Sequence, residues 1–532
     1  RPFYNAEAAY LIWLFAGSFL LFTCASEEFL KQVSHLLIGI FLILAFWGLI
    51  QYTTGYLVLV DMGGRANAIF ITPNTFAASV NAILLPLIVI YLISKDRKYL
   101  LPVLLFIFSA LLVTKSRGGW LAFLSSIIFI LILIKIVVVK LEKKKLKKLI
   151  AGLMIVFAGY SAVDLSGYDR INNKLLFDKE FGHVIRFSGS DAFVSGMSAR
   201  FQLFDIAWQQ IKLKPIMGYG LHTYKYYKKR DQQPPFYNSR GRFAHNDYLQ
   251  IWMETGFFGV MLFVSIFVVP IFLLMKFKKI MRENEKIYMI SIIAGLASLY
   301  AHALVDFIFY VPFLIFAMAS GLGLINQIIN RSVQLEYSVN FSNKIMRTGI
   351  FKCLAGVIMI WTLSQPVIAQ SSYNIAKKRM NRLDIKGAFS CLEIARRFAP
   401  YEAGYYWYEG ALLMNAVRTE QHKQSAKRAD EIFSMGMQGK SFDARNKLAR
   451  IQLHRDYGHL LEKREELAVL LSWNKEALHW HPHDPLIQSE FLKTLLAMGA
   501  YAKAKSLLDI YILQSPESKE LLKLKVLLRE NG

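Results

Sequence analysis

Cysteine and charge are both scarce in this sequence. Only three cysteines occur among the 532 residues, Cys24, Cys353 and Cys391, and none lies in a CxxC pair or at a Cys/His spacing typical of a metal site. The cysteines therefore form no disulfide framework and give no support to structural zinc or redox chemistry. Charged residues make up 19% of the chain, whereas about 25% is typical of soluble domains. This balance argues against a disordered chain or an ordinary soluble enzyme.

Apolar residues, by contrast, are abundant and come in blocks. They make up 55% of the chain, in runs of about 20 residues, the length that crosses a bilayer as a helix. The sequence therefore predicts an all-α, polytopic helical membrane protein with a C-terminal helical-repeat domain. We expect one or more further spans upstream of residue 1. The ten predicted spans are residues 8–24, 33–51, 75–94, 99–114, 119–139, 148–164, 256–275, 287–305, 307–329 and 348–366.

Lysine and arginine in the loops predict the orientation of these spans. The net charge is +25, and four basic loops, 95–98, 140–148, 276–286 and 330–347, all fall on one side of the ten-span arrangement. Such loops mark the cytoplasmic side of a membrane protein. The predicted organisation is spans one to six in 1–164, an extracytoplasmic loop with catalytic motifs in 165–255, spans seven to ten in 256–366, and an extracytoplasmic tail in 375–532.

The predicted outer loop is itself long, polar and basic over residues 165–250. Its lysines and arginines do not set the topology, since the rule that basic loops face the cytoplasm applies to short loops and not to long ones. They form either a solvated basic face or a site for an anionic ligand at the outer membrane surface. No recognised nucleic-acid-binding motif accompanies the charge, so we expect no nucleic acid partner.

The tail at 375–532 has a different composition, with helix formers and regularly spaced alanines. The step from Pro482 to Pro516 is 34 residues, the period of tetratricopeptide repeats. We predict a short array of such repeats, whose concave surface would bind a protein partner or an acceptor. A merely structural cap is the alternative.

Polar residues near the outer ends of the spans are the candidates for chemistry. Arg117 lies between two spans, where a charge is costly and is either functional or an anchor to membrane lipid. Arg200 is predicted to open an amphipathic helix, and His245 lies where the outer loop meets the seventh span. His302 and Asp306 are four residues apart on one predicted helix face, either as a catalytic pair or, as we favour, as a hydrogen-bonded structural pair.

Two arginines and a histidine at one membrane face suggest a particular chemistry. Arginine binds phosphate through two parallel hydrogen bonds and stays charged. A neutral histidine can accept a proton from a hydroxyl group near neutral pH. Together they suit the attack of a hydroxyl on a carbon whose leaving group is pyrophosphate.

An ordered set of motifs over residues 35–330 resembles the O-antigen ligase superfamily. That superfamily contains lipid A-core ligases, O-antigen polymerases and bacterial O-linked oligosaccharyltransferases. The tail is similar to members that carry tetratricopeptide repeats. The motifs that carry the resemblance are Pro73-Asn74, Ser116-Arg117-Gly118-Gly119, Arg200 with Trp208, Pro215-x-x-Gly218-x-Gly220, His245-Asn246-x-Tyr248-Leu249 and Glu254-x-Gly256.

The resemblance implies a membrane glycosyltransferase that is inverting and needs neither metal nor cofactor. It would transfer a glycan from undecaprenyl pyrophosphate to an acceptor hydroxyl, on lipid A-core or a similar molecule, at the outer face of the bacterial inner membrane. It also implies that Arg117 and Arg200 bind the donor pyrophosphate and that His245 is catalytic. The positions that could support them are Asn74, Tyr248, Glu254, His302 and Asp306.

Four other functions stay open at this point. A pure scaffold would use the repeat tail and treat the membrane part as an anchor, but it would not need Arg117. An O-antigen or exopolysaccharide polymerase and a protein O-oligosaccharyltransferase would use the same donor with a different acceptor. A transporter of lipid-linked sugar would also have many spans and outer cations, but it would not need a reactive histidine beside two arginines.

Overall fold

The computed structural model describes residues 6–57, 64–70, 72–94, 97–137, 141–165, 168–169, 174–175, 191–232, 242–333, 349–400, 402–438 and 443–530. Parts of the predicted basic loops 95–98, 140–148 and 330–347, and most of 166–190, lie outside these residues. The chain divides into two compact units. The membrane unit comprises Ala9–Leu221 and Phe243–Ala355, and the repeat unit comprises Arg1–Ala8, His222–Arg242 and Gly356–Gly532.

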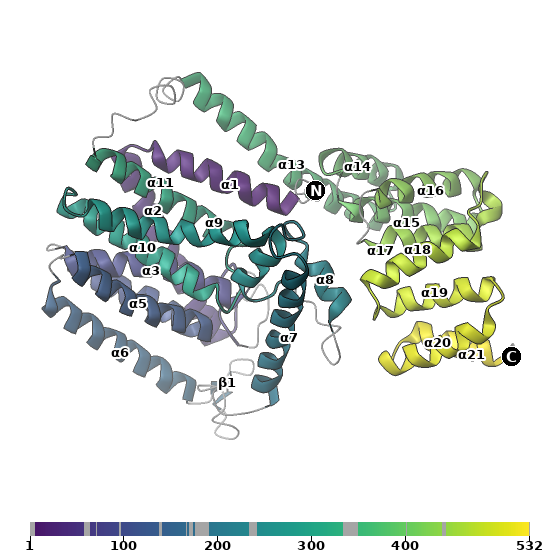
Figure 1. Ribbon diagram of the computed structural model, residues 1–532, viewed down its shortest axis with the longest axis horizontal. Helices are drawn as coiled ribbons and strands as arrows, with labels where there is room; N and C mark the ends of the chain where they lie inside the picture. The colour runs from purple at the N-terminus through teal and green to yellow at the C-terminus, as the bar shows by residue number, and fades with distance from the viewer. Residues whose placement is uncertain are drawn as a thin grey trace. The chain divides into compact units, whose positions relative to one another are not determined.

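The predicted all-α class is confirmed. In the described residues the only strands are β1 (Tyr168–Asp169) and β2 (Lys174–Leu175), which pair antiparallel with Tyr168 opposite Leu175. Each of the ten predicted spans coincides with a helix. All but the last of these helices belong mainly to the membrane unit, where they lie side by side as a bundle (Figure 1), whereas the last lies mostly within the repeat unit. These helices are α1 (Ala6–Thr23), α2 (Glu27–Thr54), α3 (Pro73–Ile93), α4 (Leu100–Val113), α5 (Arg117–Val137), α6 (Lys143–Leu165), α9 (Asp247–Phe277), α10 (Glu283–His302), α11 (Pro312–Val333) and α13 (Gly349–Asn381).

Length and composition single out six of these helices as able to cross a membrane, counting only the residues that the structure describes: α2, α3, α5, α6, α9 and α11. Two more, α1 and α4, are apolar but shorter. Large apolar side chains are exposed on α5, α6 and α9, such as Ile128, Ile155 and Leu262. A soluble protein rarely exposes so much apolar surface, whereas a bilayer covers it.

Helix α3 forms the centre of the membrane unit and is buried along nearly its whole length. It packs against α10, where Gly295 lies close to the carbonyl of Ala82 and to Pro86. The start of α3 is fixed by a capping box between Thr72 and Thr75, with Pro73 in the first turn. This cap holds the following residue, Asn74, at a defined place on the bundle end.

The segment predicted as an outer loop contains helices. Helix α7 (Asp191–Leu213) packs against α9 and begins well before Arg200, which therefore lies inside a helix rather than at its start. Helix α9 begins at Asp247, not at residue 256. Its backbone breaks at Gly256, whose φ is +73°. Helix α10 ends at His302, and residues 303–311 form a turn before α11, where the ninth span was expected to begin at residue 307.

The repeat unit is a succession of helices in which each packs against the next. Close contacts rely on small residues, such as Gly410 against Phe433 and buried alanines along the array. Tetratricopeptide-type repeats remain a prediction, although a helical array is present. The helices are α14 (Ile385–Phe398), α15 (Ala403–Glu420), α16 (Lys423–Met437), α17 (Ala444–Asp456), α18 (Leu467–Trp480), α19 (Pro485–Ala497), α20 (Tyr501–Gln514) and α21 (Lys519–Glu530).

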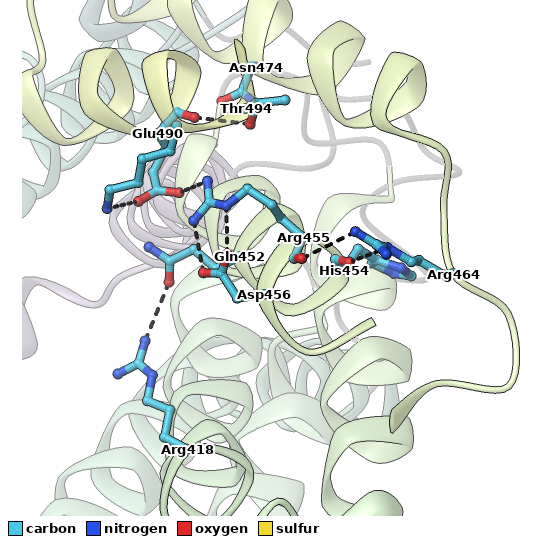
Figure 2. Close-up of polar contacts among 10 residues, drawn as sticks. Arg418, Gln452, His454, Arg455, Asp456, Arg464, Asn474, Glu490 and Thr494 are labelled. Atoms are coloured by element: carbon cyan, nitrogen blue, oxygen red, sulfur yellow. Dashed lines mark hydrogen bonds and ion pairs between the residues drawn. The ribbon is translucent and has the colours of Figure 1, made fainter. Parts of the chain in front are cut away.

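Buried charges fix the register of these helices (Figure 2). Arg455 on α17 donates to Glu490 on α19 over 2.7 Å, and Lys493 donates to the same carboxylate over 2.7 Å. Burial alone would raise the pKa of Glu490, but Arg455 and Lys493 hold that pKa below its usual value. A buried pair of this kind tolerates little displacement of one helix along the other.

Helix α8 (Tyr224–Asp231), from the middle of the predicted outer loop, packs on α18 within the repeat unit. The ring of Tyr227 meets that of Trp480 edge to face, with centroids 5.5 Å apart. The guanidinium of Arg230 lies 4.8 Å from the Tyr227 ring and 5.6 Å from the Trp480 ring. Stacking and cation–π contact therefore attach this part of the loop to the tail.

Candidate active site

His245 is held in an unusual backbone conformation just before α9. Its φ is +55°, in the left-handed region that residues with a side chain rarely adopt. The residues on both sides are anchored, since the Ala244 N–H donates to the Gln250 side chain over 2.8 Å and the Asn246 side chain caps α9. The ring lies edge-on to Phe307 and is 26% exposed. Such local strain, held by neighbouring contacts, is common at functional sites.

The imidazole of His245 is paired with a buried carboxylate. Its Nδ1 lies 2.8 Å from Oδ1 of Asp306, whose side chain is 2% exposed. Since a carboxylate can only accept, Nδ1 carries the proton, and Nε2 of the neutral ring is then the basic nitrogen. This arrangement, with the base oriented by an acid, is the one that general-base catalysis by histidine uses.

Asp306 is ionised over the whole physiological range. Burial would raise the pKa of its carboxyl group, but the hydrogen bond and charge of His245, with help from His302 and the Phe307 N–H, lower that pKa to about 2. The stabilisation that the carboxylate contributes is therefore present above about pH 4, its unfolded pKa, and is lost as the pH falls towards 2.

A second layer of hydrogen bonds orients Asp306. Asn74 donates its amide N–H to the other carboxylate oxygen, Oδ2. The amide oxygen of Asn74 in turn accepts from Nη2 of Arg65 over 2.7 Å and from Oγ of Ser116 over 2.9 Å. Arg65 also donates to the carbonyl of Thr114 over 2.9 Å. The chain from Arg65 through Asn74 and Asp306 to His245 thus joins the starts of α3, α5 and α9.

The two predicted phosphate-binding arginines lie at this same end of the membrane unit. Arg117 is exposed and is the first residue of α5, directly after Ser116 and before Gly118, which packs against His302. Arg200 on α7 lies close enough to His302 for its charge to act on that imidazole. An anion between α5 and α7 would therefore meet positive charge from both helices.

The predicted structural pair of His302 and Asp306 does not form. His302 is the last residue of α10 and is almost fully buried, but its ring makes no hydrogen bond within the described residues. The Asp306 carboxylate is directed instead to His245, Asn74 and the Phe307 N–H. Sequence spacing suggested the nearer histidine, whereas the fold selected one 61 residues away.

Other motif residues hold the site together rather than line it. Asp247 is fully buried and accepts from the backbone N–H groups of Ile308 and Phe309, over 2.7 and 3.0 Å. Tyr248 donates to the carbonyl of Tyr300 over 3.0 Å. The Asp247 contacts fix the turn that carries Asp306 against the start of α9, and the Tyr248 contact joins α9 to the last turn of α10.

Glu254 belongs to the same supporting set. Its buried carboxylate accepts from Gln250 over 3.1 Å and from the hydroxyl of Tyr310 over 3.0 Å. Burial raises the pKa of Tyr310 well above its usual value, so the hydroxyl keeps its proton and donates. Glu254 thereby ties α9 to the turn before α11.

Two glycine motifs dock on each other through their backbones. The N–H of Gly220 donates to the carbonyl of Glu254 over 2.7 Å, and the N–H of Phe257 donates to the carbonyl of Pro215 over 2.8 Å. A Cβ on Gly256 would lie 1.9 Å from the carbonyl oxygen of Ile216, and its φ of +73° favours glycine. The spacing of these glycines therefore reflects a close approach of two chain segments.

One residue of the site, Arg65, was missed by sequence reasoning. It lies in the short polar segment after Gly64 and belongs to none of the motifs. The signal available was a lone arginine between two apolar blocks at the outer end of the spans, which is the same argument that selected Arg117.

Comparison with known proteins adds one finding. Residues 102–264 match the family model described as O-antigen ligase. The matched segment contains Arg117, Arg200, His245 and Glu254, but it covers less than half of the chain and stops short of Asp306. Members of that family are membrane glycosyltransferases of ligase or polymerase type, which supports an enzyme of this general class. No curated protein matched the chain.

The docking of the glycine motifs gives a first prediction. Gly256→Ala places a methyl group against the backbone of Ile216 and forces a left-handed φ on alanine, so we expect a clear drop in the melting temperature of the detergent-solubilised protein, corresponding to about 2 kcal/mol or more. Gly159→Ala on α6 is the matched control, because a Cβ there meets nothing within 4 Å. Equal melting temperatures for the two variants would contradict the docking.

Proposed function

We propose that this protein is a membrane glycosyltransferase of O-antigen ligase type. It transfers a glycan from undecaprenyl pyrophosphate to a hydroxyl group of an acceptor, lipid A-core or a similar molecule, at the outer face of a bacterial inner membrane. The observation that carries the proposal is the contact between His245 and the buried Asp306, at the end of a helical bundle and partly within the segment that matches the O-antigen ligase family.

The reaction assigned to this site is a single displacement at the anomeric carbon. Nε2 of His245 takes the proton of the acceptor hydroxyl while the oxygen forms its bond to the anomeric carbon. The bond from that carbon to the pyrophosphate oxygen breaks, and the electron pair leaves with the pyrophosphate. Attack from the face opposite the leaving group inverts the configuration. Asp306 stabilises the imidazolium that forms.

Arg117 and Arg200 are assigned to the departing pyrophosphate. Negative charge grows on the leaving group as the bond breaks, and guanidinium groups stabilise it through charge-assisted hydrogen bonds. Their positions at the start of α5 and within α7 would place this charge beside His245 without the help of a metal ion. The membrane keeps the polyprenyl chain of the donor in lipid while its head reaches the bundle end.

The orientation is part of the proposal. The basic loops at 95–98, 140–148, 276–286 and 330–347 support a cytoplasmic location for the opposite bundle end, because such loops favour the cytoplasmic side. The site and the repeat unit are then extracytoplasmic, where lipid-linked glycans are consumed. We assign the helical array the role of binding a protein partner or the acceptor, because stacked helices form extended binding surfaces.

A transporter of lipid-linked sugar is disfavoured by the paired carboxylate. Moving a lipid across the membrane requires cations for its phosphates, but it requires no oriented base with a buried acid beside it. A polymerase or a protein O-oligosaccharyltransferase would use the same site, and only the acceptor would distinguish them from a ligase.

The direct test is transfer by the purified full chain in detergent. The donor is an undecaprenyl-pyrophosphate glycan, the acceptors offered are lipid A-core, a second lipid-linked glycan and a serine-containing peptide, and products are identified by mass spectrometry. We expect His245→Ala to lower turnover by about a hundredfold or more, because the acceptor then lacks its base. His459→Ala, an exposed histidine of the repeat unit, is the control.

Near-normal turnover by His245→Ala would remove His245 as the base. The product that forms with wild type decides between ligase, polymerase and protein glycosylation. We also expect activity to persist in a chelator. Loss of activity that a divalent ion restores would overturn the metal-independent mechanism.

The arginines are tested by a substitution that keeps their charge. Arg117→Lys and Arg200→Lys should each lower kcat/KM by roughly tenfold to a hundredfold, since lysine lacks the planar fork that binds two phosphate oxygens. Arg331→Lys, an exposed residue of a predicted cytoplasmic loop, should have no effect. Wild-type kinetics in both test variants would leave these arginines as anchors to lipid.

Asp306 is predicted to act through His245 and not on the donor. Asp306→Asn should therefore lower kcat by about a hundredfold while the donor KM changes little. Asp247→Asn provides the comparison, because that carboxylate accepts two backbone N–H groups and is expected to affect melting temperature instead. If Asp306→Asn only lowered the melting temperature and left kcat unchanged, its role would be structural.

A further inference from the structure

His302 is a buried histidine whose ring makes no hydrogen bond within the described residues. Its side chain ends α10 and is 1% exposed, yet neither ring nitrogen has a hydrogen-bond partner among the described residues. Burying a polar group without a partner costs free energy, so such groups call for an explanation. The neighbouring Asp306, Asn74 and His245 are all hydrogen-bonded, whereas both ring nitrogens of His302 lack a partner among the described residues.

The imidazole faces the first turn of α5. A Cβ built on Gly118 would lie 3.1 Å from Nε2 of His302 and 2.8 Å from Val305, so only glycine leaves room for the ring there. Helix α5 has 21 residues, and Gly118 is its second. The N–H of Gly119 donates to Oγ of Ser116, whereas the N–H of Gly118 has no hydrogen-bond partner in the part of the chain that the structure describes.

An unpartnered imidazole therefore lies beside an unpartnered N–H at the start of a helix. Helix starts favour anions, because their N–H groups and the helix dipole present positive charge. Arg117 is next in the chain and Arg200 lies within electrostatic range of His302. The nearby carboxylate of Asp306 is already bonded to three donors and makes no hydrogen bond to the ring.

We propose that His302 and the first turn of α5 form a phosphoryl-binding subsite for the lipid-linked donor. In it, a ring N–H of His302 and the N–H of Gly118 donate to an oxygen of the pyrophosphate. The assignment rests on the proposed function, and it adds a second histidine to the site with a role in binding rather than in proton transfer. Gly118 is required because a side chain would displace the ring.

The test measures binding rather than transfer. Farnesyl pyrophosphate is titrated into the purified full chain in detergent, with farnesol, inorganic pyrophosphate and phosphatidylglycerol as separate arms. His302→Leu should weaken farnesyl pyrophosphate binding by about tenfold through the lost hydrogen bond. It should not lower the melting temperature, because leucine leaves no polar atom unsatisfied. His302→Gln, whose amide N–H can take the place of Nε2, should restore most of the affinity.

Gly118→Ala should weaken binding to a similar degree by pushing the ring aside, whereas Gly159→Ala should bind as wild type does. Unchanged affinity in His302→Leu overturns the subsite while leaving the proposed function intact. If His302→Leu and His302→Gln both lower the melting temperature and both weaken binding to the same degree, His302 serves packing alone. That result also overturns the subsite. Phosphatidylglycerol that binds as tightly as farnesyl pyrophosphate overturns the assignment to the donor. If wild type binds farnesyl pyrophosphate no better than farnesol, the proposed function fails as well.

Discussion

The buried carboxylate of Asp306 is the group on which the rest of the site depends. It accepts hydrogen bonds from His245, from Asn74 and from its own neighbour Phe307, so groups from three separate parts of the chain converge on one side chain. Away from water these charge-assisted bonds are strong, and removing the carboxylate would leave three donors without their partner. The same bonds fix the tautomer of His245 and the direction of its basic nitrogen.

Some residues of the motifs around this carboxylate are proposed to act on the substrates, and others only support the structure of the site. Arg117 and His245 are the residues proposed to act on the substrates, whereas Asp247 and Glu254 are fully buried and tie α9 to the turn that carries Asp306. The glycines at 218 and 256 serve backbone contact alone. A site that must hold a strained histidine against a membrane helix requires such rigid support, because a small displacement of a catalytic base greatly slows a reaction.

The segment between α6 and α9 joins the two units by the chain itself. Its first helix, α7, packs on α9 in the membrane unit and carries Arg200, while α8 packs on α18 in the repeat unit through Tyr227, Arg230 and Trp480. Only residues 214–223 separate these helices, and they include the glycine motif bonded to α9. The tail therefore holds a piece of the same segment that supplies the proposed donor site.

Sequence alone determined the helical class, the positions of the apolar helices and the candidates Arg117, Arg200 and His245. Bilayer thickness sets the length of an apolar run, and a charge near it is conspicuous, so both signals are local. The tertiary structure decided the partners. Asp306 lies 61 residues from His245 and 232 from Asn74, whereas helical periodicity can relate only residues three or four apart. Periodicity therefore suggested His302 as the partner of Asp306. Only the folded chain showed that the carboxylate is directed to His245 and Asn74.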